Sequence, residues 1–157
     1  MIAWIKHLLM RCFVYETSPS QLALAAAFSV YVSFSPFLGF HTLMVIGAGF
    51  IFRLNIPLML LIGYGINNPF TMIPVYMSGY LVGYWVLHSF LYINIVQANP
   101  WWMHSINSFL YYHLGMTDIS FWAFMLGGNL LGVVLACLSY IVLLPLFVKL
   151  SKQRYHQ

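Results

Sequence analysis

The chain has 157 residues, of which 62% are apolar and only 5% are charged. A soluble domain carries charged residues at about a quarter of its positions, so these few charges cannot cover a water-facing surface. The composition excludes a soluble globular domain, a disordered segment and a coiled coil, and it predicts an all-α integral membrane protein.

Residues 1–16 carry apolar side chains at helical spacing, with Lys6, His7 and Arg11 between them. This pattern predicts an amphipathic N-terminal helix that lies in the membrane interface, because the charges interrupt it too often for a crossing. The same charges argue against a cleavable signal peptide.

Residues 17–96 contain two segments with the same order of features, and we expect them to form a paired helical-hairpin membrane domain. Apolar stretches at 21–34 and 58–66 end at Ser35-Pro36-Phe37 and Asn68-Pro69-Phe70, and apolar sequence then resumes in both. The residue before a proline avoids the α conformation, whereas proline suits a first helical turn. Pro36 and Pro69 therefore mark positions where one helix ends and another begins.

The first arms of these hairpins, about 15 and 10 residues long, would reach only about 22 and 15 Å. Because that is short of a full crossing, we favour at least one re-entrant or broken helix at membrane depth. The alternative is that both prolines kink ordinary spanning helices or lie in loops.

Residues 97–118 are expected to form an extracytoplasmic interfacial segment. Its aromatic residues suit a membrane belt, and its apolar residues suit a second interfacial helix. The belt residues are Trp101, Trp102, Tyr111 and Tyr112, and the helix residues are Ile106, Phe109 and Leu110.

Residues 119–148 form an uncharged run that would be about 45 Å long as a helix, which is enough for one C-terminal transmembrane helix. We expect Pro145 to mark its fraying end. Residues 149–157 form a basic tail, which the positive-inside rule places in the cytoplasm. Because Lys6 and Arg11 place the N-terminus there too, we expect an even number of crossings.

Two pairs of glycines at four-residue spacing, Gly79 with Gly83 and Gly128 with Gly132, allow helices to approach closely. Packing within one chain is the favoured interpretation, and a homodimer contact is the alternative. Asn129 lies between the second pair and is expected to form a hydrogen bond across the same contact.

Three motifs in this chain resemble those of the bacterial membrane family known as domain of unknown function 2062. They are Phe34-Ser35-Pro36-Phe37-Leu38-Gly39-Phe40-His41-Thr42, Arg53-Leu54-Asn55-Ile56-Pro57 and Asn67-Asn68-Pro69-Phe70-Thr71. The resemblance covers roughly residues 18–88, although Ser29 and Ser33 stand where the family tends to have glycine.

The resemblance implies a small protein of the bacterial inner membrane, in a family whose domain can be fused to others, including glycosyltransferases. That context points towards envelope lipid or polysaccharide metabolism. Paired hairpins are also similar, at the level of fold, to the DedA-type membrane proteins linked to lipid-carrier translocation. A shared fold does not fix a function.

The chemistry-bearing residues do not favour an enzyme. Glu16 and Asp118 are the only carboxylates in the sequence, and both are expected at the edges of segments. The six histidines show no i, i+4 pairing and the two cysteines have no metal-ligand spacing, so we expect no metal and no cofactor. Basic residues near the two ends suit anionic lipid headgroups, and no nucleic-acid partner is expected.

The two Pro-Phe turns are the candidate binding site. Helix N-termini at membrane depth would form an anion site, with Arg53 as the cation for a phosphate. Further contacts are expected from His41, Ser35, Thr42, Asn67, Asn68 and Thr71, on turns shaped by Pro36, Gly39 and Pro69. Arg53 could instead hold headgroups in a cytoplasmic loop, and the two asparagines could hold the hairpins together.

Three functions fit these observations. The first is a transporter or scramblase of an anionic envelope lipid or a polyprenyl-phosphate carrier, and this is the function we favour. The second is a small ion or solute channel or transporter. The third is a non-transporting assembly partner of an envelope enzyme. Positive charge near the turns and the family context favour the first.

Overall fold

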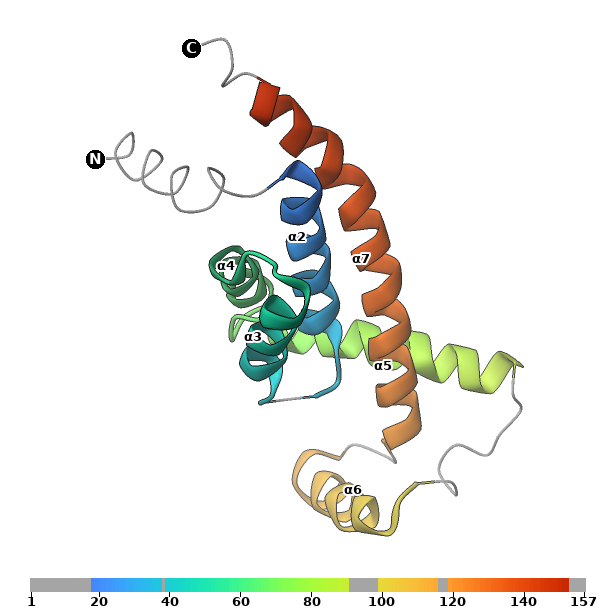
Figure 1. Cartoon of the computed structure of the whole chain (residues 1–157). Helices are drawn as coiled ribbons and strands as arrows, with labels where there is room; N and C mark the ends of the chain where they lie inside the picture. Colours follow the sequence, from blue (N-terminus) through green and yellow to red (C-terminus); the bar gives the residue numbers. More distant parts are fainter. Residues whose placement is uncertain (1–17, 38, 91–98, 116–118, 153–157) are drawn as a thin grey trace.

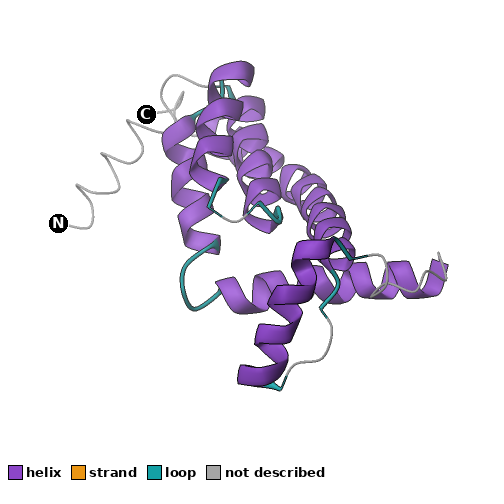
Figure 2. Cartoon of the chain, turned by 90° about the horizontal axis from the view of Figure 1, so that it is seen from below, coloured by secondary structure: helices purple, strands orange, loops and turns teal. Residues whose placement is uncertain are grey.

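The computed structural model describes residues 18–37, 39–90, 99–115 and 119–152, and it is helical throughout that part, with no strand (Figures 1 and 2). The helices are α2 (Pro19–Phe34), α3 (His41–Phe52), α4 (Ile56–Ile66), α5 (Met72–Phe90), α6 (Trp101–Leu114) and α7 (Phe121–Lys152). The predicted all-α class is confirmed. The predicted helix at residues 1–16 and the end of the basic tail lie outside the described residues.

Local sequence explains both ends of α2. The Ser18 hydroxyl accepts a hydrogen bond from the Gln21 backbone, the Gln21 side chain accepts one from the Ser18 backbone, and Pro19 lies in the first turn. This capping box satisfies amide groups that would otherwise lack partners. The helix ends at Phe34 because Ser35, before Pro36, is extended with ψ 137°. The predicted break at Pro36 is confirmed.

The second break also lies at a proline but has a different local structure, because α4 ends at Ile66 with Asn67 as its C-cap. The Asn68 side chain accepts hydrogen bonds from the backbone of Phe70 at 2.9 Å and of Thr71 at 3.1 Å. These bonds close a turn around Pro69, after which α5 begins at Met72. The prediction that one helix ends and another starts at this proline is also confirmed.

The helices do not pair as two closed hairpins. Helix α7 packs lengthwise against α2, whereas α5 runs across α7 (Figure 1). Helices α3 and α4 pack against each other and against α2. Because α4 packs on α2 and α3 while α5 packs mainly on α7, the second predicted hairpin is open. The hairpin is open because glycines at the crossing of α5 and α7 let α5 pack closely on α7 instead of on α4.

Glycine allows the backbones of α5 and α7 to touch. A Cβ added at Gly83 would overlap the carbonyl oxygen of Ala123, and one added at Gly127 would overlap that of Gly79. Any larger residue at these positions would push the helices apart. The expected use of Gly79 and Gly83 in packing within the chain is confirmed.

The second glycine pair faces α2. A Cβ at Gly128 would lie 2.8 Å from the carbonyl oxygen of Phe34, and one at Gly132 would lie 3.1 Å from that of Tyr31. Between them, Asn129 accepts a hydrogen bond of 2.8 Å from the Tyr31 hydroxyl. The predicted hydrogen bond of Asn129 across this contact is confirmed.

Among the described helices, α7 alone is both long and apolar enough to cross a membrane, whereas α2, α3 and α4 are apolar but shorter. Its 32 residues correspond to about 48 Å. The expectation that it frays at Pro145 is wrong, because α7 continues to Lys152. A proline removes one backbone donor, and the residues that follow still bond to earlier carbonyl groups.

Helix α6 lies across the start of α7 and is attached there by two asparagines (Figure 1). The Asn107 side chain pairs with both backbone groups of Ile119, at 3.1 and 3.2 Å. The Asn99 side chain bonds the Ile119 carbonyl and the Phe121 amide. These bonds satisfy backbone groups where α7 begins. A helix was predicted within 97–118, and α6 confirms it.

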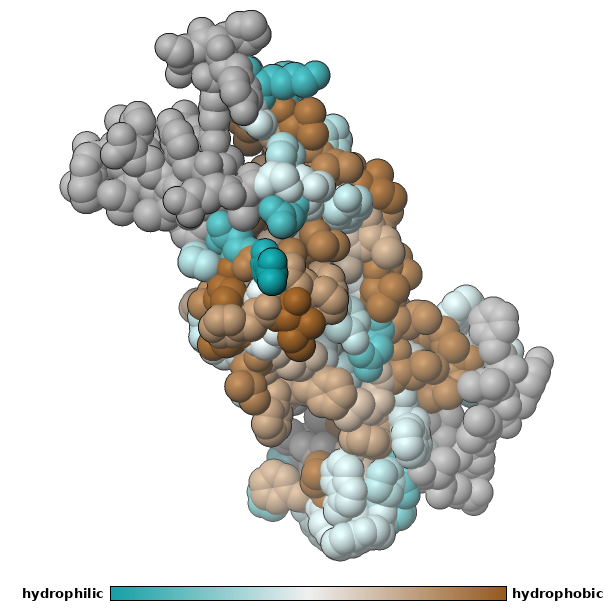
Figure 3. Space-filling view, viewed as in Figure 1, coloured by the Kyte–Doolittle hydropathy of each residue, from teal (hydrophilic) through white to brown (hydrophobic). Residues whose placement is uncertain are grey.

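The surface is apolar over most of the described part. Large apolar side chains are exposed on every described helix, including Ile51 at 76% and Ile141 at 66%. Figure 3 shows hydrophobic residues across the middle of one face and paler, more hydrophilic ones over α6. Continuous apolar surface of this kind fits contact with lipid.

Candidate binding site

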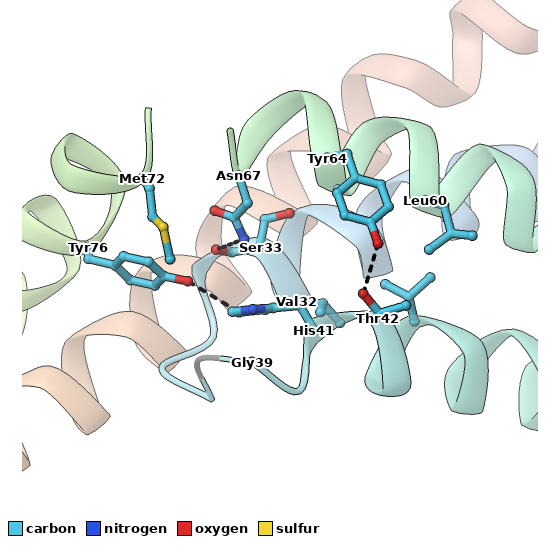
Figure 4. Close-up of a pocket in the computed structure, with 12 residues that line it drawn as sticks. Val32, Ser33, Gly39, His41, Thr42, Leu60, Tyr64, Asn67, Met72 and Tyr76 are labelled. Carbon is cyan, nitrogen blue, oxygen red and sulfur yellow. Dashed lines mark hydrogen bonds between the residues drawn. The ribbon is translucent and has the colours of Figure 1, made fainter. Parts of the chain in front are cut away.

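A cavity of about 170 Å³ lies where the two Pro-Phe turns meet, between the end of α2, the start of α3, the end of α4 and the start of α5 (Figure 4). Its polar lining residues are Ser33, His41, Thr42, Tyr64, Asn67 and Tyr76, and its apolar ones are Val32, Val45, Leu60 and Met72, with Gly39 and Gly63. Four segments from different parts of the chain therefore build one small site, in which polar groups lie within a mostly apolar lining.

His41 lies in the first turn of α3 and connects the two turns. Its Nε2 is 3.0 Å from the carbonyl oxygen of Ser35 and 3.5 Å from the Tyr76 hydroxyl. A carbonyl oxygen only accepts hydrogen bonds, so this assigns the ring proton to Nε2 and makes His41 the donor. The proton of the Tyr76 hydroxyl then has no acceptor on that nitrogen and remains available to a ligand.

Asn67 joins α4 to α2 and leaves one polar atom unsatisfied. Its Nδ2 donates a hydrogen bond of 3.0 Å to the carbonyl oxygen of Ser33. Its Oδ1 is buried and has no hydrogen-bond partner among the described residues. A buried unpaired acceptor costs about 1–3 kcal/mol. The hydroxyl of Ser35 is also buried and unpaired in the same part of the chain.

The rim and the floor of the cavity differ in exposure. Thr42 and Tyr64 are exposed, and their hydroxyl groups lie 3.0 Å apart. Ser33 is buried, and its hydroxyl donates to the carbonyl oxygen of Ser29, whose own hydroxyl donates to Met59. Hydrogen bonds of the two buried serines therefore extend from the cavity floor into the contact between α2 and α4.

The first turn of α3 adds backbone donors. Its N-cap residue, Phe40, forms no side-chain cap. The amide groups at a helix start carry partial positive charge when no side chain caps them. Because His41 and Thr42 line the cavity, this uncapped turn lies at its edge. The chain enters α3 through Gly39, whose φ of +85° lies in the left-handed region that favours glycine.

The position of the two turns along α7 follows from the glycine contacts. Gly128 is seven residues into α7, about 10 Å along its axis, and Gly132 is about 16 Å along it. The end of α2 lies against both. A bilayer core of about 30 Å centred on this helix of about 48 Å begins about 9 Å from its start, which places the end of α2 just inside one edge of the hydrocarbon region.

The structure brings together only part of the predicted site. His41, Thr42 and Asn67 line the cavity together with Gly39. Ser35 contributes its carbonyl oxygen to His41, while Asn68, Pro69 and Thr71 form the neighbouring turn and do not line the cavity. Pro36 is buried near Gly128.

Arg53 is separated from the cavity. It follows the last residue of α3, whereas His41 is the first, so the length of α3, about 18 Å, lies between them. Arg53 is exposed and adopts a left-handed conformation with φ at 53°. The predicted set of residues therefore does not meet as a single phosphate site with Arg53 as its cation.

Several lining residues were not predicted from the sequence. Leu60 and Tyr64 lie seven and three residues before Asn67, which was predicted, and this spacing places all three on one face of α4. This spacing is the signal that could have identified Tyr64. Ser33 reaches the cavity through the packing of α4 on α2, and Tyr76 reaches it from α5, where its hydroxyl meets His41 of α3. Neither arrangement can be derived from local spacing.

The described residues include no group of three or more histidine, cysteine, aspartate or glutamate side chains that could hold a metal ion. They define an all-helical protein with one helix long and apolar enough to span a membrane and a small cavity of mixed lining beside a pair of proline turns. The chain belongs to the family called domain of unknown function 2062, described as an uncharacterized protein conserved in bacteria, whose model matches residues 2–156. No curated protein and no solved structure matches the chain.

Proposed function

We propose that this chain is a multi-pass protein of the bacterial inner membrane that moves an anionic envelope lipid or a polyprenyl-phosphate carrier across the bilayer. The cavity at the two proline turns holds the headgroup in transit. The observation that carries this proposal is a small cavity with six polar side chains in a mostly apolar lining, at the end of α2 that packs on Gly128 and Gly132 of α7. Lipid movement requires such a site, because a headgroup cannot cross hydrocarbon without polar partners.

The proposed topology has both termini in the cytoplasm and residues 97–118 on the opposite side. It is supported by the first residue of α2 and the last residue of α7, which lie at the same end of the molecule (Figure 1). The exposed aromatic side chains of α6, such as Trp101 and Tyr112, suit the far interface. In this topology α2 and α3 enter the membrane and return to the cytoplasmic side at Arg53, and the segment from α4 to α6 makes one net crossing before α7 returns.

Each group at the cavity has a role in this proposal. The uncapped first turn of α3 and the Tyr76 hydroxyl contact phosphate oxygens, and His41 fixes the geometry of the turn. Asn67 contacts a second group of the ligand. Arg53 attracts anionic headgroups towards the other end of the α3–α4 pair, and it stays outside the cavity.

The test is lipid translocation in liposomes that contain the full chain. Tail-labelled anionic phospholipid and labelled polyprenyl phosphate are followed by quenching from outside, for the wild type, Asn67→Leu and the exposed control Ser108→Ala. We expect the wild type and the control to move one of these lipids and Asn67→Leu to slow it about tenfold. Movement no faster than in empty liposomes, with folded protein, would reject transport.

A further inference from the structure

We infer that the headgroup held in the cavity is a phosphodiester that also carries a hydrogen-bond donor, either a hydroxyl or an ammonium group. This inference rests on the proposed function. It favours the phosphodiester lipids over the polyprenyl phosphate, and it extends them to a lipid whose ammonium group balances the phosphate charge. It comes from three properties of the cavity: an unpaired acceptor, a set of unpaired donors, and the lack of a charged side chain in its lining.

The unpaired acceptor is Oδ1 of Asn67, which is buried beside the cavity and is reached by a ligand when a neighbouring side chain moves. Its orientation is fixed, because the Ser33 carbonyl oxygen accepts from the amide nitrogen and would repel the amide oxygen. Figure 4 shows the oxygen of Asn67 turned away from Ser33, on the side of Met72. Met72 also lines the cavity, and its flexible thioether is a group that a ligand can displace.

A phosphate diester cannot satisfy this acceptor by itself, because its oxygens only accept hydrogen bonds. A hydroxyl or an ammonium group beside the phosphate can donate to Oδ1 and remove the penalty of an unpaired buried oxygen. The cavity should therefore prefer a headgroup with such a donor over one of similar charge and size that has none.

The unpaired hydrogen-bond donors come from α5 and from the start of α3, whereas Asn67 comes from the end of α4. The Tyr76 hydroxyl proton is not taken by His41, whose Nε2 donates to Ser35. The first turn of α3 has no side-chain cap and presents amide groups at the same edge. Phosphate oxygens are the acceptors that an uncapped helix start binds best.

The charge of the cavity lining favours a phosphodiester over a phosphomonoester. The described residues that line the cavity include no lysine, arginine, aspartate or glutamate, and Arg53 lies about 18 Å away along α3. A helix start supplies about half a positive charge, which offsets part of one negative charge. A phosphomonoester with up to two negative charges lacks a counter-ion there. The cavity is therefore better suited to a phosphodiester lipid than to a polyprenyl phosphate.

The experiment measures binding in detergent, separately from transport. The affinity of the purified full chain is compared for phosphatidylethanolamine, phosphatidylglycerol, phosphatidylcholine and a polyprenyl phosphate, by ligand-dependent thermal stabilisation. Phosphatidylcholine differs from phosphatidylethanolamine in having no N–H donor. We expect phosphatidylethanolamine and phosphatidylglycerol to bind about tenfold more tightly than the other two.

The variants separate hydrogen bonding from headgroup size. Asn67→Leu should abolish the difference between phosphatidylethanolamine and phosphatidylcholine, whereas the exposed control Ser108→Ala should keep it. Tyr76→Phe should weaken all phosphodiester lipids by a similar factor, because it removes a donor to phosphate. If Asn67→Leu does not fold, the comparison of the four lipids on the wild type still decides the inference.

The outcomes distinguish this inference from the proposed function. Equal affinity of the wild type for phosphatidylethanolamine and phosphatidylcholine, or tightest binding of the polyprenyl phosphate, overturns the inference even if lipid is transported. Donor-selective binding without any translocation supports the inference and rejects transport. Absence of binding for all four lipids overturns both.

Discussion

The side-chain nitrogen of Asn67 lies 3.0 Å from the carbonyl oxygen of Ser33, and this hydrogen bond joins the ends of two helices 34 residues apart in sequence. It holds the second proline turn against the first. It adds to the packing of α4 on α2 and to the contact between His41 and Tyr76. The same side chain carries a buried oxygen that has no hydrogen-bond partner among the described residues.

The α5–α7 crossing depends on the absence of a side chain at Gly83. We predict that Gly83→Ala lowers the free energy of unfolding by about 1–3 kcal/mol, because its Cβ would overlap the Ala123 carbonyl oxygen. Gly47→Ala is the matched control, since Gly47 lies inside α3 with open space around it. Alanine there should stabilise by about 0.5–1 kcal/mol. Unfolding in detergent measures both, and equal effects would contradict the proposed packing.

The protein should be more stable with glycine at position 53 than with alanine there. The left-handed conformation of Arg53 is strained for any residue with a Cβ, and both substitutions remove the same charge. We predict that Arg53→Gly is about 1 kcal/mol more stable than Arg53→Ala in the same unfolding measurement. Both variants should bind lipid in the cavity with wild-type affinity. Loss of that binding in both would place Arg53 in the site.

The attachment of α6 should fail when Asn107 is replaced. Asn107→Ala removes two hydrogen bonds to Ile119, at 3.1 and 3.2 Å. We expect hydrogen exchange of the α6 amides to become faster, while exchange in α2 stays unchanged, because local openings follow local contacts. Ser108→Ala, next to it on α6, serves as the control. Unchanged exchange in α6 would show that other contacts hold this helix.

The hydrogen bond between α2 and α7 is predicted to contribute about 1 kcal/mol to stability. Tyr31→Phe removes its donor and leaves Asn129 Oδ1 without that partner. Tyr140→Phe is the control, because the Tyr140 hydroxyl has no hydrogen bond to another described residue. Thermal unfolding in detergent should separate the two variants. Equal stability of the two would mean that the Tyr31 bond is worth nothing net.

The helix boundaries around both prolines could be predicted from the sequence because proline acts locally. A proline disfavours the α conformation of the residue before it, and apolar sequence on both sides of Pro36 and Pro69 identified these two as breaks. The start of α7 followed from the long uncharged run. Its end did not, because the effect of Pro145 depends on whether the neighbouring turns still hold the helix.

The arrangement of the helices could not be predicted. Four-residue glycine spacing indicates close packing, but nothing in it says that Gly79 and Gly83 face α7 while Gly128 and Gly132 also face α2. Which helix each glycine faces depends on the whole set of helix contacts. The second hairpin is open because Gly79 and Gly83 face α7.

The same limit applies to the site. The sequence indicated that His41 and Asn67 belong together, since each lies near a proline turn. It also grouped Arg53 with them, because a lone charge in an apolar stretch points to function. Helix length separates Arg53 from the cavity, and that separation depends on α3 being one straight helix that starts at His41.

The most direct test of the central claim is to locate a lipid headgroup on the chain by photolabelling. A phosphodiester lipid with a diazirine beside its phosphate is added to membranes that contain the full chain, and labelled peptides are mapped after irradiation. The account predicts label in residues 32–45 and 60–76, reduced about tenfold in Asn67→Leu and unchanged in Ser108→Ala. Label that is absent from both segments, or that is unaffected by Asn67→Leu, would contradict it.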